Sequence, residues 1–335
     1  MKKLRLFHIL FLILVILMIA FVFVRIKKWV RVVSFDEISE TDDSVANYEN
    51  HDSIMPLTDE QFKLIRQKEE VILVLGNEPF AEGRGREDSL AAMLERATGG
   101  EVINCAVEGS CMSMEEPAFD ISRSHMNIFS PYYLSCVACS KIDYEADLQV
   151  ALNASGDDLP KEGEEVLKTL KELDMDRVDV VVIFYDGADY LKGVPTGLDE
   201  KRFDDPYCTF LGSFSATVEM IRSSYPGIRF IVMSAPYMYH VSDDGTWEPN
   251  EDHPNTEGAS LSDYVMAQYN LCVNGHDISF LDDYYTGINL NDGYGYLTDG
   301  RYLNTEGRKL LCDRLLYAIN FYDSENMGKV DISAT

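Results

Sequence analysis

Basic residues are scarce in this chain of 335 residues, in which 29 lysines and arginines stand against 57 aspartates and glutamates, for a formal net charge of −28. Seven of the basic residues fall within the first 31 positions, where there is no acidic residue, so the rest of the chain carries 22 basic and 57 acidic residues. A surface of this charge repels phosphates and anionic headgroups. Nucleic acid is therefore not an expected partner.

Cysteine is also sparse, and its seven residues are an odd number. The single C-x-x-C pair, Cys136 and Cys139, has no second pair and no neighbouring histidine, which argues against zinc. Several other cysteines stand in apolar runs and are expected in the core, although one disulfide stays open. The sequence predicts no cofactor.

Histidine is rarer still, at six residues. His240 and His253 stand in an acidic stretch, where a metal clamp is conceivable. Because the stretch lacks the spacing of an EF-hand loop, a solvated acidic loop is the favoured interpretation. We therefore predict no metal site.

One long apolar run, 7–24, contains a single polar residue, His8, and is just long enough to span a bilayer. No small-x-small cleavage pattern follows it, so an uncleaved signal anchor is expected, with residues 1–6 as a short tail. A short tail before a large domain favours a single-pass protein of the cell membrane whose C-terminal domain is extracytoplasmic. The membrane is then a partner through this N-terminal helix.

The acidic stretch 25–67 has weak periodicity and is expected to be a juxtamembrane stalk, with a short helix near 60–68. A compact domain is predicted over 68–323, followed by a flexible tail, 324–335. Short apolar runs in this domain predict strands at 71–76, 101–104, 178–185, 228–234 and 278–282. Helical spacing predicts helices at 87–98, 167–173, 210–224, 260–273 and 305–321, whereas 111–175 is the least regular part.

Strands that alternate with helices at these spacings predict a parallel sheet with helices on both faces, a three-layer α/β/α sandwich. In such sheets, ligands bind outside the carboxyl ends of the strands. Four stretches of the chain occupy positions of that kind. They are Gly76-Asn77-Glu78, 104–110, Asp186-Gly-Ala-Asp189-Tyr190 and Asp299-Gly-Arg-Tyr302-Leu-Asn304.

The order and spacing of these four blocks resemble the SGNH/GDSL hydrolase family, a flavodoxin-like group of esterases, deacetylases and acyltransferases, over residues 70–322. The resemblance implies a serine nucleophile in the first block, oxyanion donors from a glycine and an asparagine in the next two, and a histidine base with its aspartate in the last. Carried onto this chain, the triad positions are Glu78, Asp299 and Tyr302. The oxyanion positions are Gly109 and Ala188.

Three of these positions depart from the family pattern, namely Glu78 in place of serine, Ala188 in place of asparagine and Tyr302 in place of histidine. A tyrosine titrates near pH 10 and is a poor base at neutral pH, and Glu78 puts a negative charge where an oxyanion would develop. Loss of a nucleophile or base typically costs about a millionfold in kcat. The replacements predict a catalytically degenerate member, with Asn77, Asp186, Asp189 and Tyr190 as further pocket candidates.

The resemblance implies ester or acetyl chemistry on cell-surface glycans as the ancestral activity. Aromatic residues near the expected mouth would suit the apolar face of a sugar; they are Phe80, Tyr185, Tyr190, Tyr237, Tyr239, Tyr294, Tyr296 and Tyr302. One hypothesis is a degenerate protein that binds cell-surface carbohydrate or an envelope protein. The alternative is an active ester hydrolase or acetyl-transferring enzyme that uses a metal or an unaligned nucleophile, with Ser110, Ser113 and His125 as candidates.

Overall fold

The computed structural model describes residues 50–57, 70–155, 158–197, 205–274 and 278–321. The predicted anchor at 7–24, the helix near 60–68 and the tail from 324 lie outside these residues. Among the helices that are described, none combines the length and the apolar character that a membrane span requires.

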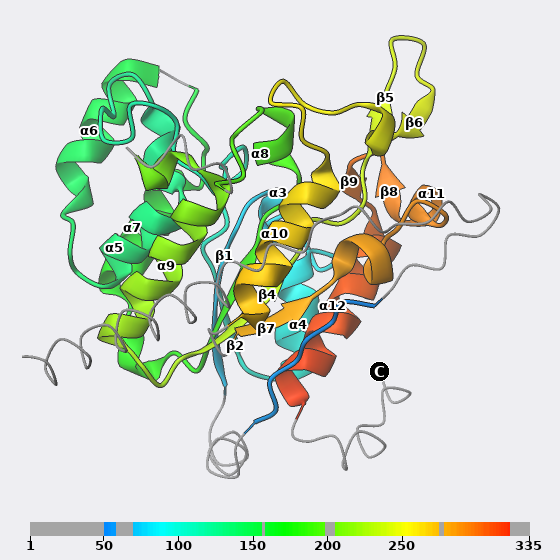
Figure 1. Cartoon of the computed structure of the whole chain (residues 1–335). Helices are drawn as coiled ribbons and strands as arrows, with labels where there is room; N and C mark the ends of the chain where they lie inside the picture. Colours follow the sequence, from blue (N-terminus) through cyan, green and yellow to red (C-terminus); the bar gives the residue numbers. More distant parts are fainter. Residues whose placement is uncertain (1–49, 58–69, 156–157, 198–204, 275–277, 322–335) are drawn as a thin grey trace, which may run out of the picture. The chain divides into compact units, whose positions relative to one another are not determined.

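A five-stranded, wholly parallel sheet forms the centre of the domain, in the order β2-β1-β3-β4-β7 (Figure 1). The strands are β1 (Val71–Gly76), β2 (Glu101–Asn104), β3 (Val180–Phe184), β4 (Arg229–Met233) and β7 (Ile278–Leu281). Numbered along the chain, this is the 2-1-3-4-5 order of flavodoxin-like folds. The predicted parallel sheet and all five of its strands are confirmed.

Helices cover both faces of the sheet (Figure 1). On one face lie α4 (Leu90–Thr98) and α12 (Thr305–Asn320), which contact each other. On the other face lie α5 (Pro131–Ala138), α9 (Phe210–Ser224) and α10 (Leu261–Val273), while α7 (Gly163–Glu172) packs on α5, and α6 (Tyr144–Ser155) packs on η1 (His125–Phe129). The three-layer prediction is confirmed.

Shorter elements connect these layers. The helical ones are α3 (Glu78–Ala81), η2 (Met175–Arg177), α8 (Ala188–Leu191), η4 (Pro206–Cys208), η5 (Asn250–Asp252), η6 (Asp283–Gly287) and α11 (Gly293–Tyr296). Two antiparallel pairs lie apart from the main sheet. They are β5 (Tyr239–Val241) with β6 (Trp247–Pro249), and β8 (Leu297–Thr298) with β9 (Tyr302–Leu303).

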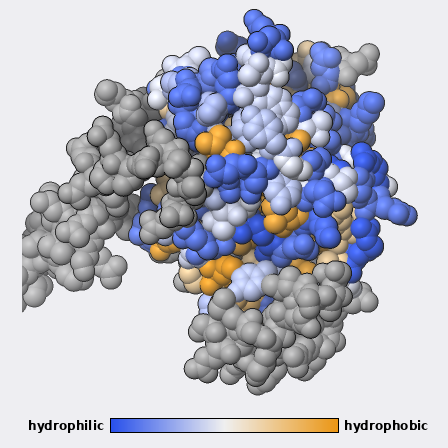
Figure 2. Space-filling model, turned by 90° about the vertical axis from the view of Figure 1, so that its right-hand side faces the viewer, coloured by the Kyte–Doolittle hydropathy of each residue, from blue (hydrophilic) through white to orange (hydrophobic). Residues whose placement is uncertain are grey.

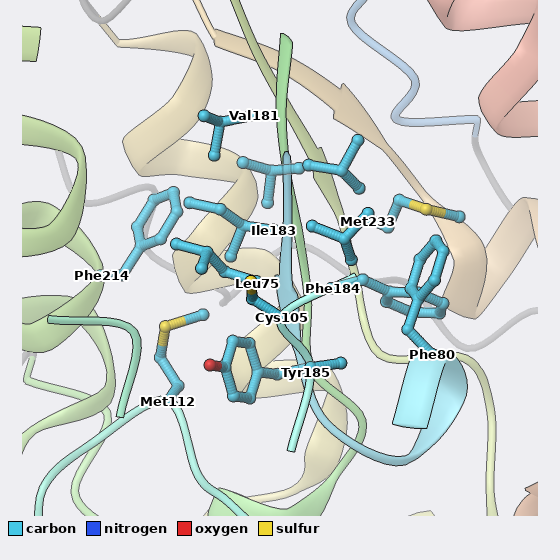
Figure 3. Close-up of a cluster of buried hydrophobic side chains, with 14 of the residues drawn as sticks. Leu75, Phe80, Cys105, Met112, Val181, Ile183, Phe184, Tyr185, Phe214 and Met233 are labelled. Atoms are coloured by element: carbon cyan, nitrogen blue, oxygen red, sulfur yellow. The ribbon is translucent and has the colours of Figure 1, made fainter. Parts of the chain in front are cut away.

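Side chains of β3 alternate between the two faces of the sheet (Figure 3). Ile183 points towards Phe214 of α9, whereas Phe184 points to the opposite side and meets Phe80 of α3. The rings of Phe80 and Phe184 lie 6.1 Å apart at 86°, an edge-to-face contact. Burial on both faces explains why β3 is an uninterrupted apolar run.

Helix caps set the boundaries of the predicted helices. The helix predicted from residue 87 begins at Leu90, because the Ser89 hydroxyl accepts the amide of Ala92 and caps the helix there. It ends where Gly99 adopts φ 69° and closes the last turn. Ser260 and Asp263 form a capping box at the start of α10.

The stretch 111–175 is more regular than its sequence indicates, since it contains η1 and the helices α5, α6 and α7. All but one of the eight residues of α5 are buried, so this helix lacks the one-sided apolar pattern that reveals a surface helix. Cys136 lies in α5 and Cys139 directly after it. All seven cysteines are buried and free.

Residues 50–57 lie along β7, so the compact part of the chain begins well before the predicted boundary at residue 68. Ser53 and Phe280 exchange two backbone hydrogen bonds of 2.9 and 2.8 Å, and the amide of Leu57 donates to Phe321. Backbone pairing needs no apolar side chains, which is why a polar segment predicted to be stalk can dock on the sheet.

Candidate functional site

Asn77 follows β1 directly and joins three segments at the carboxyl edge of the sheet. Its Nδ2 donates to the Ser110 carbonyl at 3.0 Å and to Asp186 Oδ1 at 2.7 Å, and its Oδ1 accepts the Asp186 amide at 2.9 Å. At the preceding residue, a Cβ on Gly76 would lie 2.3 Å from the Phe184 carbonyl oxygen, so only glycine allows this close approach of β1 to β3. Asn77 is completely buried and thus fixes the loops of the site.

Asp186 and Arg301 form the central ion pair of the site. Arg301 Nε and Nη2 donate to Asp186 Oδ2 at 2.9 and 2.7 Å. The other carboxylate oxygen accepts the amide of Ala188 at 2.9 Å as well as Asn77 Nδ2. Asp186 is buried, and charge-assisted bonds of this kind are the strong ones in proteins.

Glu78 is the first residue of α3, and its carboxylate lies beside this pair. Arg301 Nη2 is 3.5 Å from Glu78 Oε1, and the glutamate side chain is 12% exposed. Burial, and next the charge of Asp186, raise the pKa of Glu78 to about 7, although Arg301 acts to lower it. A carboxyl group with such a pKa can exchange its proton near neutral pH.

Gly109 contributes a backbone amide to the surroundings of Glu78. Its φ of 75° is a left-handed conformation that glycine adopts without strain. This amide acts to lower the pKa of the Glu78 carboxyl, although burial and Asp186 raise it further. The glycine predicted to serve an oxyanion thus lies near the carboxyl group of Glu78.

The predicted candidates after β3 have structural roles. The Ala188 amide is used by Asp186. Asp189 is buried, and burial raises its pKa even though it accepts the amides of Met112 and Ser113 and the Ser113 hydroxyl. The Tyr190 hydroxyl donates to the His253 carbonyl. Asp189 and Tyr190 therefore hold neighbouring loops instead of facing Glu78.

The two serines considered as substitute nucleophiles are both engaged. Ser110 is buried and its hydroxyl donates to the Val107 carbonyl at 2.8 Å. The Ser113 hydroxyl donates to Asp189 at 2.6 Å. His125 lies in η1, and no serine–histidine hydrogen bond occurs among the residues that the structure describes.

Asp299 and Tyr302 flank the arginine that completes the site. Asp299 is exposed, with φ 53°, in the turn between β8 and β9. Tyr302 is 38% exposed, and its ring centre lies 5.3 Å from Cζ of Arg301. In the described part of the chain, the ionic partner of Glu78 from this block is Arg301 rather than either predicted residue.

The family pattern does not predict a role for Arg301, because it assigns its roles to the positions near it, Asp299 and Tyr302. A signal was available, since a basic residue is rare in this chain and two acidic residues were expected at the same edge. The guanidinium already supplies positive charge to Asp186 and Glu78. One positive charge faces two carboxyl groups, so the cluster is electrically neutral when Glu78 is protonated.

Most of the aromatic residues expected around the mouth belong to the core. Phe80, Tyr185, Tyr190, Tyr237 and Tyr239 are all at most 5% exposed. They follow strand ends, but their rings turn inward and pack, as Phe80 does on Phe184. Tyr294, at 62% exposed, and Tyr302 are the exposed members of the set.

A cavity of about 380 Å³ lies at the opposite end of the sheet from Glu78. Its lining includes Val178, Asp179 and Arg229, at the amino ends of β3 and β4. Because the four predicted blocks lie at the carboxyl ends, this cavity plays no part in the site.

Comparison with known proteins supports the fold. No protein-family model matches the sequence, and no curated protein matches it. One solved structure superimposes with a TM-score of 0.50 at 19% identity, over 75% of this chain and 96% of the other. A possible lipase from Chitinophaga pinensis gives a TM-score of 0.45 at 12% identity, over 74% of this chain and 96% of that one. A carbohydrate acetylesterase from Sinorhizobium meliloti gives 0.44 at 13% identity, over 75% and 98%.

The sheet order and the position of the blocks define an SGNH hydrolase-like fold with a divergent sequence. The residues of the site differ from the serine, asparagine and histidine of the family pattern. At its centre, Glu78 and Asp186 share Arg301.

Proposed function

We propose that this chain is a membrane-anchored SGNH/GDSL hydrolase-like protein that binds cell-envelope carbohydrate and does not hydrolyse esters through a serine. The observation that carries the proposal is the ion cluster of Glu78, Asp186 and Arg301 at the position of the nucleophile. A serine hydrolase needs a hydroxyl paired with a base at this point and an empty donor site for the oxyanion. Here a carboxylate takes both places.

Carbohydrate is the favoured ligand because an aromatic pair with one exposed ring, that of Tyr294, lies near the turn that carries Arg301. Trp247 and Tyr294 stack with ring centres 5.1 Å apart at 9°. A Cβ on Gly300, the neighbour of Arg301, would lie 3.6 Å from Trp247. A flat aromatic face beside carboxylates and a guanidinium matches a sugar, which has an apolar CH face and hydroxyl groups.

The side of the molecule that carries β6 and α11 in Figure 1 has a polar surface. In Figure 2, which shows the side of the molecule at the right of Figure 1, the described residues are mainly hydrophilic, and the hydrophobic ones form small separate patches. Such a face suits a glycan better than the acyl chain of a lipid.

The test combines binding and turnover on the full-length protein. We expect binding to acetylated envelope polysaccharide, measured by calorimetry, to weaken about tenfold or more in Tyr294→Ala, since stacking on one aromatic face is lost. Phe119→Ala is the matched control, because Phe119 is 58% exposed and belongs to another part of the surface, where it packs on Tyr207. Hydrolysis of p-nitrophenyl acetate should stay at the background rate. Equal binding by wild type and Tyr294→Ala would contradict the proposal.

A second candidate is ester hydrolysis with water as the nucleophile, and the pKa of about 7 at Glu78 favours it. The ionised carboxylate would accept a proton from water, which would then attack an acetyl ester. The two candidates separate in one comparison. Turnover of acetylated glycan that falls at least a hundredfold in Glu78→Gln supports the enzyme, whereas absent turnover with retained binding supports the binding protein.

A further inference from the structure

Two histidines and a glutamate come together beside the β5–β6 hairpin, outside the cluster around Glu78. His240 and Glu248 are directly paired across the hairpin, so their side chains lie on the same face. His253 follows five residues after Glu248, beyond η5, and its Nε2 is 2.8 Å from Glu248 Oε2. One ligand atom from each of the three lies within 4.8 Å of the others.

Hydrogen bonds with neighbouring groups fix the backbone of His253. Its carbonyl accepts the Tyr190 hydroxyl, and its amide donates to the Asn250 carbonyl at 3.0 Å. The Asn250 side chain is itself buried and donates to the Met238 carbonyl at 2.6 Å. The backbone position of His253 is therefore set by buried groups and does not depend on a ligand.

The rings of His240 and His253 stack with centres 3.8 Å apart at 16°. One ion cannot lie in the planes of two near-parallel rings, so an imidazole must turn about its side-chain bonds before both histidines bind the same ion, and the exposed side chain of His240 has room to do so. Imidazole nitrogens with one carboxylate are the ligands that zinc-like divalent ions prefer, and three protein ligands leave a coordination position open.

We propose that His240, Glu248 and His253 bind one divalent transition-metal ion of the zinc type, with an open position for water or a ligand. The sequence predicts a solvated loop here because the loop is rich in acidic residues. The pairing of His240 with Glu248 depends on the register of the hairpin, which the spacing of residues in the sequence does not reveal. The three side chains of this site are not those of the proposed carbohydrate surface, so each proposal has its own test.

The test is calorimetric titration of zinc chloride into the full-length protein, purified with an affinity tag that contains no histidine. We expect one ion per chain. Loss of groups that merely orient ligands costs 10- to 100-fold in affinity, so His240→Ala, His253→Ala and Glu248→Gln should each cost about 100-fold or more. Cobalt(II) as a probe should show the visible absorption of a low-coordinate site in the wild type and lose it in these variants.

Two control variants separate this site from general attraction of cations. Asp243→Asn removes an exposed charge of the same hairpin loop, and His125→Ala removes a histidine elsewhere. Both should bind zinc as the wild type does. The proposal is overturned if the triplet variants keep full affinity, or if Asp243→Asn loses as much as Glu248→Gln. Because Glu248→Gln keeps the shape of the side chain, it decides the question even if a histidine variant fails to fold.

Discussion

At the scale of single residues, Arg301 accounts for the coexistence of two carboxylates at a buried edge. Asp186 receives two of its N–H groups and Glu78 lies 3.5 Å away. Without the guanidinium, two carboxylates would lie close together in a poorly solvated site, and their repulsion would strongly raise the pKa of one of the two carboxyl groups. Even with Arg301 present, the carboxyl of Glu78 keeps a pKa of about 7.

This pKa predicts how stability depends on pH. The folded-state pKa of Glu78 lies above its ordinary value of 4.5, so the protonated form favours folding. That contribution is complete below about pH 4.5 and is lost as the pH rises through about 7, by up to about 3 kcal/mol. We expect Glu78→Gln, which is neutral at every pH, to unfold at higher urea concentration than the wild type at pH 8 and at a similar concentration at pH 5.

The matched control is Glu95→Gln, since Glu95 is exposed on α4. It should leave the difference in unfolding free energy between pH 5 and pH 8 unchanged. If Glu78→Gln lowers stability at pH 8, the ionised carboxylate is stabilised by its neighbours, and our account of the cluster is wrong.

The sequence predicted part of this cluster. Glu78 and Asp186 follow apolar strands, and the rule that parallel strands carry their site at the carboxyl ends brought them together. It did not predict that Asp189 serves the loop at Met112 and Ser113, because the direction of a side chain after a strand depends on the turn that follows. Nor did it predict that the Tyr190 hydroxyl donates to the His253 carbonyl.

At the scale of elements, buried parallel strands and capped amphipathic helices were predictable. β3 and α9 lie where the pattern put them, because an unbroken apolar run predicts a buried strand and a fifteen-residue segment of helical spacing predicts a helix. The helix α5 was missed because it is buried on nearly every side. The short β5–β6 pair was missed because three residues in each strand carry too little periodicity to detect.

The pairing of residues 50–57 with β7 gives a prediction at this scale. Ser53→Pro removes the amide that donates to Phe280 at 2.9 Å, and should cost about 1–3 kcal/mol of stability if the segment peels away with it. The Phe280 amide, which donates to Ser53 at 2.8 Å, should then exchange with deuterium faster. Hydrogen exchange read by mass spectrometry measures this directly.

Ser53→Ala is the control, because alanine keeps the backbone amide and should leave both stability and exchange unchanged. Unaltered protection of Phe280 in Ser53→Pro would mean that the segment does not lie on β7 in solution.

At the scale of the whole molecule, charge is the dominant feature. The net charge of −28 places many like charges on one surface, and their repulsion favours the expanded chain. Salt weakens repulsion between exposed charges once the screening length falls to a few ångströms. Buried pairs such as Arg314 with Asp283, at 2.7 Å, are screened much less.

We therefore expect sodium chloride to stabilise the protein. Raising the concentration from about 0.01 M to about 1 M shortens the Debye length from roughly 30 to roughly 3 Å and should raise the melting temperature by several degrees. Differential scanning calorimetry measures the shift. A melting temperature that falls with salt would show that attractive ion pairs outweigh the net repulsion.

The segment on β7 also affects how copies of the protein meet. β7 ends the sheet, and an open strand edge is a template on which another chain can add itself. Residues 50–57 occupy part of that edge through Ser53. At the other end, β2 is only four residues long and carries the charged Glu101, which is bound to Arg177. Both edges of the sheet are thus unfavourable for the addition of a strand from another molecule, so the protein should resist edge-to-edge aggregation at high concentration.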